Sequence, residues 1–240
     1  MRISFKISWS RAIKEIITVC RFLLIKSTSP VRIDEFLKQF AQACFLSKTP
    51  DGDWQGDGWG ISFLSEDGRW LIRKSLLPIW RETAVFNIFP KSKFFLVHAR
   101  SASFQNQKNV IDFNQPFISP PYAFVFNGFI KGMSFPSTIQ GNIGSQKLWN
   151  MLLKLVKVEN DPTRAILHLK NLCLKMAKKI HALNIGFCDR RSIYGLCYYE
   201  CYSDYYSLYA ANLPSLSFIS SERLGEFESQ KIPPGELVVF

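Results

Sequence analysis

Two helical segments lie between two groups of strand-like segments, and this order restricts the folds that the chain can adopt. From Ser145 to about Leu183, apolar residues recur at helical spacing, first in WNMLLKLV and then in AILHLKNLCLKMAKKIHAL. Short apolar runs bounded by polar turns come before and after this block. Strands and helices segregated in this way are typical of a layered α+β domain, and no internal repeat or linker divides the sequence.

The other elements are predicted from local patterns. Residues 32–46, RIDEFLKQFAQACFL, predict an amphipathic helix with Cys44 on its apolar face. The Gly-rich TPDGDWQGDGWG predicts a loop, and the turn EDGR between ISFLS and WLIRK predicts a β-hairpin. A strand is predicted in CRFLLIK, and we expect it to end at a turn in STSP. Further strands are predicted in KFFLVHARSAS, YAFVFNGFI, NIGFCDRRSIYGLCYYE, SLYAA, SLSFISSE and ELVVF.

Composition and charge exclude several classes of protein. A chain of 240 residues with 47% hydrophobic residues is too apolar to remain disordered. The net charge of +11 is scattered and accompanies no nucleic-acid-binding motif, so we interpret it as a property of solubility rather than a sign of nucleic acid binding. The apolar run IITVCRFLLI loosely resembles a signal peptide, but Arg21 interrupts it and no small-residue cleavage site follows. Since no other window is long enough to span a bilayer, we expect a soluble cytoplasmic protein with no membrane partner.

The cysteines and histidines show no metal-binding spacing. None of the six cysteines forms a C-x-x-C pair or has a histidine at zinc-finger distance, so we expect reduced thiols and no metal. His168, Cys173 and His181 fall in the second predicted helix and are assigned no chemistry. Cys20 begins an apolar strand, where a cysteine most often serves only to fill the core.

Four separated stretches nevertheless match, in order and spacing, the class II glutamine amidotransferases, which belong to the N-terminal nucleophile hydrolases. They are CRFLLIKSTSP, DGWGISF, HARSAS followed by FNQPF, and FVFNGFI, with a weaker match in SSERL and KIPPGELVVF. The resemblance extends from Cys20 to Phe240 and is greatest to the compact, single-domain branch of the family. It implies a four-layer αββα sandwich and one amidotransferase-like domain over residues 20–240.

The resemblance also implies a mechanism that depends on where the mature chain begins. In this family the α-amine of an N-terminal cysteine is the general base for its own thiol, which attacks the side-chain amide of glutamine and forms a thioester. A peptide nitrogen cannot accept that proton, so Cys20 would have to become the first residue. Val19 can be encoded by GTG, which also serves as a bacterial start codon, and we therefore prefer a misassigned start for residues 1–19. The alternatives are a cleaved propeptide and a genuine extension that blocks the amine.

The same resemblance assigns roles to other residues and needs no cofactor. Asn127 and Gly128 match the site that stabilises the developing oxyanion, and Arg100 matches the residue that binds the α-carboxylate of the substrate. His98, in the same H-x-R strand as Arg100, and Gly144 are assigned to substrate binding. Without the resemblance, Arg100 would be a surface strand residue and Asn127–Gly128 an ordinary turn.

Two departures from the family pattern, an absent acidic pair and an absent histidine, leave the function open. Gly144 and Gln146 replace the acidic residues that open the helix after the Asn-Gly strand, and Phe126 replaces a histidine. The first interpretation is an amidohydrolase that acts on glutamine or a γ-glutamyl compound and can pass ammonia to a synthetase on another chain. The second is a catalytically decayed domain that binds a metabolite or a protein. Nucleic acid binding is a third and weaker interpretation of the positive charge.

Overall fold

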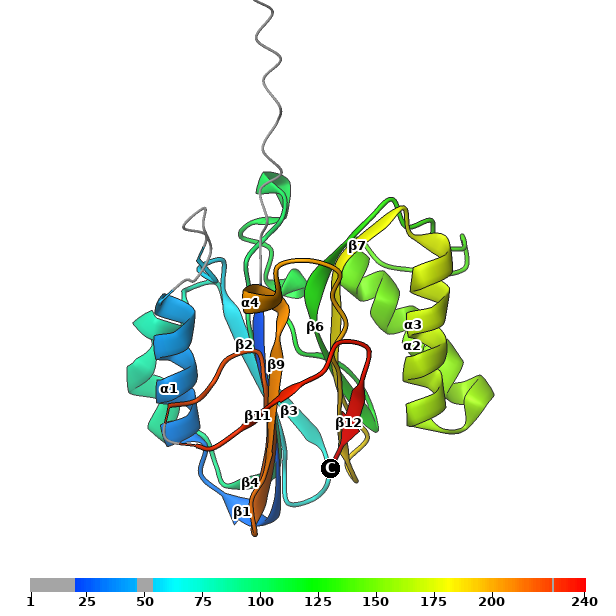
Figure 1. Cartoon of the computed structure of the whole chain (residues 1–240). Helices are drawn as coiled ribbons and strands as arrows, with labels where there is room; N and C mark the ends of the chain where they lie inside the picture. The colour runs from blue at the N-terminus through cyan, green and yellow to red at the C-terminus, as the bar shows by residue number, and fades with distance from the viewer. Residues whose placement is uncertain (1–19, 47–53, 226) are drawn as a thin grey trace, which may run out of the picture.

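Two antiparallel β-sheets lie face to face, and helices cover their outer faces (Figure 1). The computed structural model describes residues 20–46, 54–225 and 227–240, so the predicted extension 1–19 lies outside the described residues. Helix α1 (Asp34–Phe45) packs outside one sheet, and α2 (Gly144–Glu159) and α3 (Pro162–Met176) pack outside the other. The expected α+β, four-layer αββα sandwich is therefore confirmed.

The first sheet has the strand order β11-β9-β10-β1-β4-β2-β3. Its strands are β1 (Arg21–Val31), β2 (Trp59–Leu64), β3 (Trp70–Ser75), β4 (Ser92–Ala99), β9 (Leu208–Asn212), β10 (Leu216–Ser220) and β11 (Gln230–Ile232). The β2–β3 hairpin forms as predicted. The turn predicted in STSP is wrong, because β1 continues through this segment with a register shift against β4 between Lys26 and Val31.

The second sheet has the order β12-β8-β7-β6-β5 and corrects one prediction. Its strands are β5 (Phe117–Ser119), β6 (Tyr122–Lys131), β7 (Lys179–Cys188), β8 (Ile193–Leu196) and β12 (Leu237–Val239). The second helix was predicted to continue to about Leu183, but it ends at Met176 and His181 lies in β7. Strand β7 lies between β6 and β8 and is buried on both faces, so its apolar residues do not alternate as in a half-buried strand and its first residues resemble the end of a helix.

The helices follow their sequence patterns and complete the outer layers. Helix α1 forms as predicted, with Cys44 fully buried on its inner face. Asp161 caps α3 by accepting a hydrogen bond from the N–H of Arg164 at 3.1 Å. The short helices are α4 (Ser203–Tyr206) and the 3₁₀ segments η1 (Ile79–Arg81), η2 (Thr83–Ile88), η3 (Gln105–Gln107) and η4 (Ile111–Phe113). No helix among the described residues is both long and apolar enough to cross a membrane.

Strand alternation decides which side chains face the space between the two sheets. In β1, Leu23 packs in the layer with α1, whereas Phe22 and Leu24 pack between the sheets. In β6, Phe126 packs toward α2 and Val125 packs between the sheets. Because neighbouring side chains of a strand point to opposite faces, Cys20 and Asn127 both belong to the layer between the sheets. The two strands thus direct a thiol and an amide into the same layer of the fold.

Candidate active site

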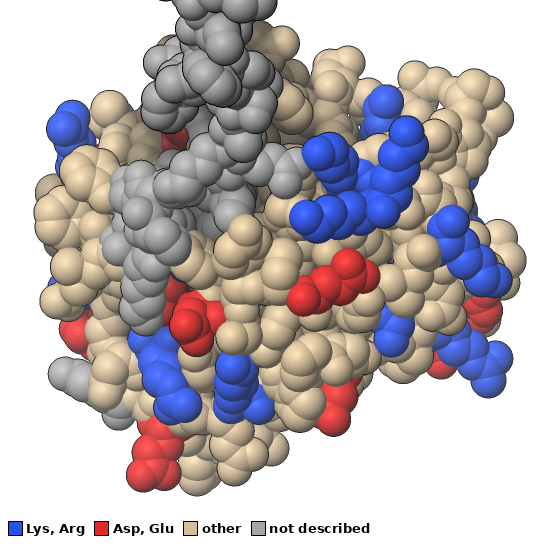
Figure 2. Space-filling model, turned by 45° about the horizontal axis from the view of Figure 1, so that its top comes forward, with Lys and Arg blue, Asp and Glu red and all other residues tan. Residues whose placement is uncertain are grey.

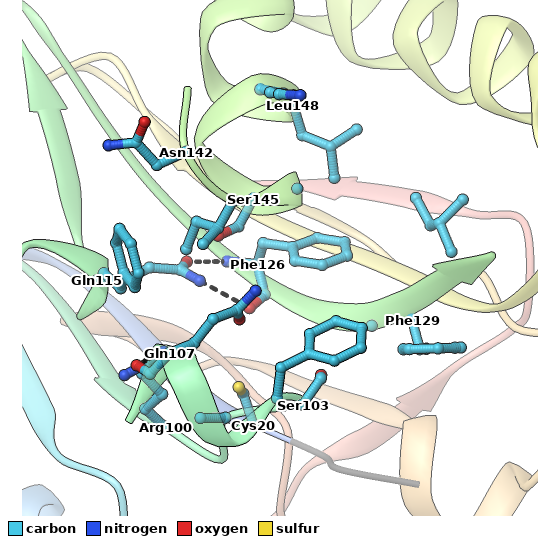
Figure 3. Close-up of a pocket in the computed structure, with 18 of the residues that line it drawn as sticks. Cys20, Arg100, Ser103, Gln107, Gln115, Phe126, Phe129, Asn142, Ser145 and Leu148 are labelled. Carbon is cyan, nitrogen blue, oxygen red and sulfur yellow. Dashed lines mark hydrogen bonds between the residues drawn. The ribbon is translucent and has the colours of Figure 1, made fainter. Parts of the chain in front are cut away.

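A cavity of about 380 Å³ opens where β1 begins, between the loop after β4, strand β6 and the N-terminus of α2. Figure 3 shows Cys20 and Arg100 on one side of it, Ser145 and Asn142 on the other, and Phe126 between them. Of the residues selected from the sequence, the cavity is lined by Cys20, Arg100, Gly128 and Gly144. Residues that are far apart in sequence therefore meet around one concave surface.

The Cys20 thiol is positioned at the edge of this cavity by its neighbours. Its sulfur accepts a hydrogen bond from the N–H of Ser101 at 3.4 Å and lies 3.5 Å from the Ser101 carbonyl oxygen. The buried Arg21 donates through Nη1 to the Cys20 carbonyl oxygen at 3.0 Å and through Nε to Glu222 at 2.8 Å. Cys20 is therefore anchored from both sides, through its main chain and through its sulfur.

The other cysteines differ from Cys20 in their surroundings. Cys44, Cys173, Cys188 and Cys197 are buried in the core layers. Burial raises the pKa of the Cys173 thiol to about 12 and that of Cys197 to about 11, so both remain protonated at neutral pH. Their role is packing, as expected for Cys44.

Arg100 is held by both its main chain and its side chain. Its N–H donates to the carbonyl oxygen of Gly58 at 2.8 Å, and its carbonyl oxygen accepts from the N–H of Asp57 at 3.0 Å. Its Nη2 donates to the carbonyl oxygen of Gln107 at 2.7 Å and its Nη1 to Oδ1 of Asn114 at 3.4 Å. Burial lowers the pKa of Arg100, whereas Cys20 and Asp57 act in the opposite direction. A guanidinium has five N–H donors, so these contacts leave donors for a ligand in the cavity.

Asn127 is fully buried, and neither atom of its side-chain amide has a hydrogen-bond partner within the described part of the chain. It is not among the residues that line the cavity, whereas its neighbour Gly128 is. A buried amide without partners is costly, and such groups in folded proteins usually have a functional reason. The amide of Asn127 and the exposed side of Gly128 are therefore the polar groups of β6 that remain for a ligand.

His98 was expected to bind substrate, but it is fully buried and is not among the lining residues. Its Nε2 lies 3.2 Å from the carbonyl oxygen of Phe126, the residue before Asn127. Strand alternation turns the His98 ring into the layer between the sheets, where it contacts the main chain of β6. The substrate-binding role expected of His98 stays a prediction.

Gln115 is a site residue that the sequence analysis missed. Its side-chain amide accepts from the N–H of Phe126 at 2.5 Å and donates to the carbonyl oxygen of Phe126 at 3.4 Å (Figure 3). The amide therefore pairs with the main chain of β6 as a neighbouring strand would. The available signal was its place inside FNQPF, a stretch that matched the family for its Asn and Pro alone.

Gly144 and Gln146 open α2 without any carboxylate. The α-carbon of Gly144 has open space where a side chain would begin, with no atom within 4 Å of an added Cβ. The Gln146 side chain accepts a hydrogen bond from the N–H of Asn142, two residues before the helix, at 2.9 Å. The described residues that line the cavity include no Asp or Glu, and no cluster of metal-binding side chains was found in the described chain.

His98 leads to a prediction about stability at low pH. Burial lowers its pKa to about 3, against the hydrogen bond to Phe126 that raises it. The unfolded state therefore binds a proton that the folded state does not, and stability present above the unfolded pKa of ~6.5 is lost as pH falls toward 3. We expect the free energy of unfolding to fall by up to about 1.4 kcal/mol per pH unit between pH 6 and 4 on account of this residue.

His98→Gln should reduce this slope when urea unfolding is followed from pH 7 to 4. His168→Gln is the matched control, because His168 is a partly exposed histidine that pairs with Glu159 at 2.7 Å on the surface. Equal slopes for the wild-type protein and His98→Gln would contradict the prediction.

Comparison with curated proteins gives one relative by sequence. No protein-family model matches the chain. Over 66% of its length the chain is 26% identical to the probable glutamine amidotransferase DUG3 of Saccharomyces cerevisiae. The match covers 52% of that protein, so the chain spans about half the length of this relative.

Solved structures resemble the chain over nearly its whole length. The match to a glutamine aminotransferase class-II domain protein from Silicibacter pomeroyi covers 92% of this chain and 94% of that protein's chain, with a TM-score of 0.61 and 18% identity. The match to glutamine phosphoribosylpyrophosphate amidotransferase from B. subtilis covers 92% of this chain and 47% of that protein's chain, with a TM-score of 0.59 and 15% identity. A predicted glutamine amidotransferase from Pseudomonas aeruginosa matches 93% and 97%, with a TM-score of 0.52 and 14% identity. At such identities the likeness shows a shared fold.

Proposed function

Because this chain has the N-terminal nucleophile hydrolase fold of the class II glutamine amidotransferases, we propose that it is an amidohydrolase acting through a Cys20 thioester. Its substrate is the side-chain amide of glutamine or of a γ-glutamyl compound. The observation that carries the proposal is the position of Cys20, whose sulfur lies at the edge of a cavity that Arg100 and Gly128 also line.

The chemistry needs a base, and the α-amine of Cys20 supplies it when Cys20 is the first residue. The amine takes the thiol proton while sulfur bonds to the amide carbon, and the tetrahedral intermediate then expels ammonia with that proton. Water hydrolyses the thioester and restores the thiol. We propose that the mature domain comprises residues 20–240 and that residues 1–19 are removed or never translated.

Asn127 and Gly128 stabilise the negative charge that develops on the carbonyl oxygen in this proposal. The amide of Asn127, which lacks a partner among the described residues, supplies one donor, and the N–H of Gly128 supplies the other. Removing one such donor typically costs about 3 kcal/mol of transition-state stabilisation. His98 and Gln115 are positioning residues, since both hold the main chain of Phe126 directly before Asn127.

Arg100 binds the carboxylate of the substrate through its remaining donors, a task suited to a planar guanidinium. No metal or cofactor enters the proposed reaction. The ammonia is released or passes to an acceptor enzyme on another chain.

A second function is favoured by Gly144, Gln146 and Phe126. All three residues depart from the pattern of the family, as expected of a domain that has lost catalysis and binds a metabolite or protein. The cavity would then be a binding site, and Cys20 would not react.

An electrophilic diazo-ketone analogue of glutamine separates the two functions. In a protein beginning at Cys20, we expect covalent labelling of Cys20 alone, measured by peptide mass spectrometry, and loss of labelling in Cys20→Ala. Cys201→Ser is the control, because Cys201 is the other cysteine that is not fully buried and it does not line the cavity. A protein in which neither the free analogue nor its N-acetylated form labels Cys20, or in which Cys201 is labelled instead, would exclude the enzymatic proposal.

A further inference from the structure

The charges around the cavity do not suit a free amino acid. Two cations, Arg100 and Lys147, line it, and the described lining residues offer no carboxylate to pair with an ammonium group. Free glutamine at neutral pH carries both a carboxylate and an ammonium. Arg100 can pair with the carboxylate. The ammonium would lie unpaired in a partly buried site beside two other positive charges, and burying it there costs binding free energy.

The side of the cavity at α2 is also positive. Helix α2 begins at Gly144, and Ile143 before it provides no side-chain cap. The unpaired N–H groups and the dipole of a helix N-terminus favour an anion. Lys147 stands one turn further along with its Nζ 5.7 Å from the centre of the Phe135 ring, so two independent features of this side attract negative charge.

Further lysines lie near one edge of the cavity, where β6 ends and β7 begins. Lys178 packs against Gly132, a lining residue, and the main chains of Lys131 and Lys179 are paired at the end of β6 and β7. All three lysines are exposed. Figure 2 shows Lys and Arg side chains gathered on one part of the face that this end of the molecule presents. An anion approaching the cavity is therefore attracted before it binds.

Much of the remaining wall is apolar and gives room for a group larger than an ammonium. The cavity volume of about 380 Å³ falls in the range of small-molecule sites, ~300–1,000 Å³. The apolar side chains of this wall include Phe126, Met133, Phe135, Ile143 and Leu148. Such a wall favours the carbon chain of a substituent rather than a charged amine.

We propose that the substrate is an anionic γ-carboxamide whose α-amine is acylated, so that no ammonium enters the cavity. This inference rests on the proposed function, because it names the substrate class of the same site. The α-carboxylate binds Arg100, the acyl group packs on the apolar wall toward α2, and a second carboxylate on the acyl group binds Lys147 and the start of α2. Lys147 is the residue that determines specificity for a dianionic substrate.

The test measures binding and does not require turnover. Calorimetry with the full chain carrying Cys20→Ala compares glutamine, N-acetylglutamine and N-succinylglutamine at low salt. We expect N-acetylglutamine to bind about tenfold more tightly than glutamine, because acylation removes the unpaired charge. N-succinylglutamine should bind about another fivefold more tightly through the charge-assisted contact with Lys147.

Three further variants identify the residues responsible. Lys147→Gln should lower the affinity for N-succinylglutamine to that for N-acetylglutamine. Lys154→Gln is the matched control, since Lys154 lies on the same helix outside the cavity and donates to the carbonyl oxygen of Thr138 at 2.9 Å. Gly144→Asp, for which the structure has space, should strengthen glutamine binding and weaken N-acetylglutamine binding by about tenfold each.

The outcomes distinguish this inference from the proposed function. Equal affinities for glutamine and N-acetylglutamine, including no measurable binding of either, overturn the inference, as does tighter binding of glutamine. Labelling of Cys20 by the diazo-ketone would still support the enzymatic proposal in that case. Tighter binding of the acylated ligands without labelling of Cys20 would support the inference about the ligand and exclude the proposal that the protein is an enzyme.

Discussion

A protein that begins at Cys20 is expected to release ammonia from a γ-carboxamide at least about 10³-fold faster than a protein that retains residues 1–19. With the extension in place, the nitrogen of Cys20 belongs to a peptide bond and cannot accept the thiol proton. As a terminal amine its unperturbed pKa of ~8 makes it a suitable base near neutral pH.

The comparison requires both proteins to be prepared with defined termini. Intact mass establishes the first residue of each, and an ammonia assay with N-acetylglutamine and glutamine measures the rate. Cys20→Ala in the shorter protein is the control for background hydrolysis and should be as slow as the extended protein. If the chain that retains residue 1 were as active as the shorter protein, the amine of Cys20 would not be the base and the mechanism would have to be abandoned.

Breaking the buried ion pair between Arg21 and Glu222 is expected to destabilise the protein by about 3–5 kcal/mol. The Nε atom of Arg21 lies 2.8 Å from Oε1 of Glu222, and the side chains of Arg21 and Glu222 are 1% and 5% exposed. Removing one partner therefore leaves a buried charge that water cannot solvate. The main chains next to these two residues are also hydrogen-bonded, because the N–H of Ser221 donates to the carbonyl oxygen of Phe22 at 2.9 Å. Arg21→Met and Glu222→Gln should each lower the urea midpoint strongly.

The double variant and a surface pair serve as controls. Arg21→Met combined with Glu222→Leu leaves no unpaired charge, so it should be more stable than either single variant. Arg69→Met breaks the exposed pair with Asp67, whose side chains are 79% and 52% exposed, and should leave the midpoint almost unchanged because water screens that pair. Single variants at Arg21 and Glu222 that behave like Arg69→Met would show that the buried pair contributes little.

Arg21 also connects stability with the candidate site. Its Nη1 holds the Cys20 carbonyl oxygen at 3.0 Å while its Nε holds Glu222. A stable double variant that still lost Cys20 labelling would identify Arg21 as a positioning residue for the nucleophile. Labelling that follows stability alone would assign it a structural role.

Local sequence patterns were sufficient where an element has one buried face or a specific turn. Helix α1 was predicted correctly because only one of its faces packs on the core, and the β2–β3 hairpin because the turn residues in EDGR are specific. The beginning of strand β7, to Leu183, was mistaken for helix because both faces of the strand are buried and its apolar residues do not show the alternation of a half-buried strand. The turn expected in STSP was wrong because pairing of β1 with its neighbours outweighs the local preference of Ser and Pro.

The sequence by itself determined the identity of the groups available for chemistry: Cys20, Arg100, Asn127 and Gly128, with glycine and glutamine in place of acids at 144 and 146. Only the tertiary structure decided which of these groups share a cavity. It placed His98 behind β6, brought Gln115 onto the main chain of Phe126, and set Lys147 beside a wall that has no carboxylate among its described residues. The physical reason is that local patterns fix the type of an element, whereas the face a side chain occupies and its distant neighbours depend on the register and order of strands far apart in the chain.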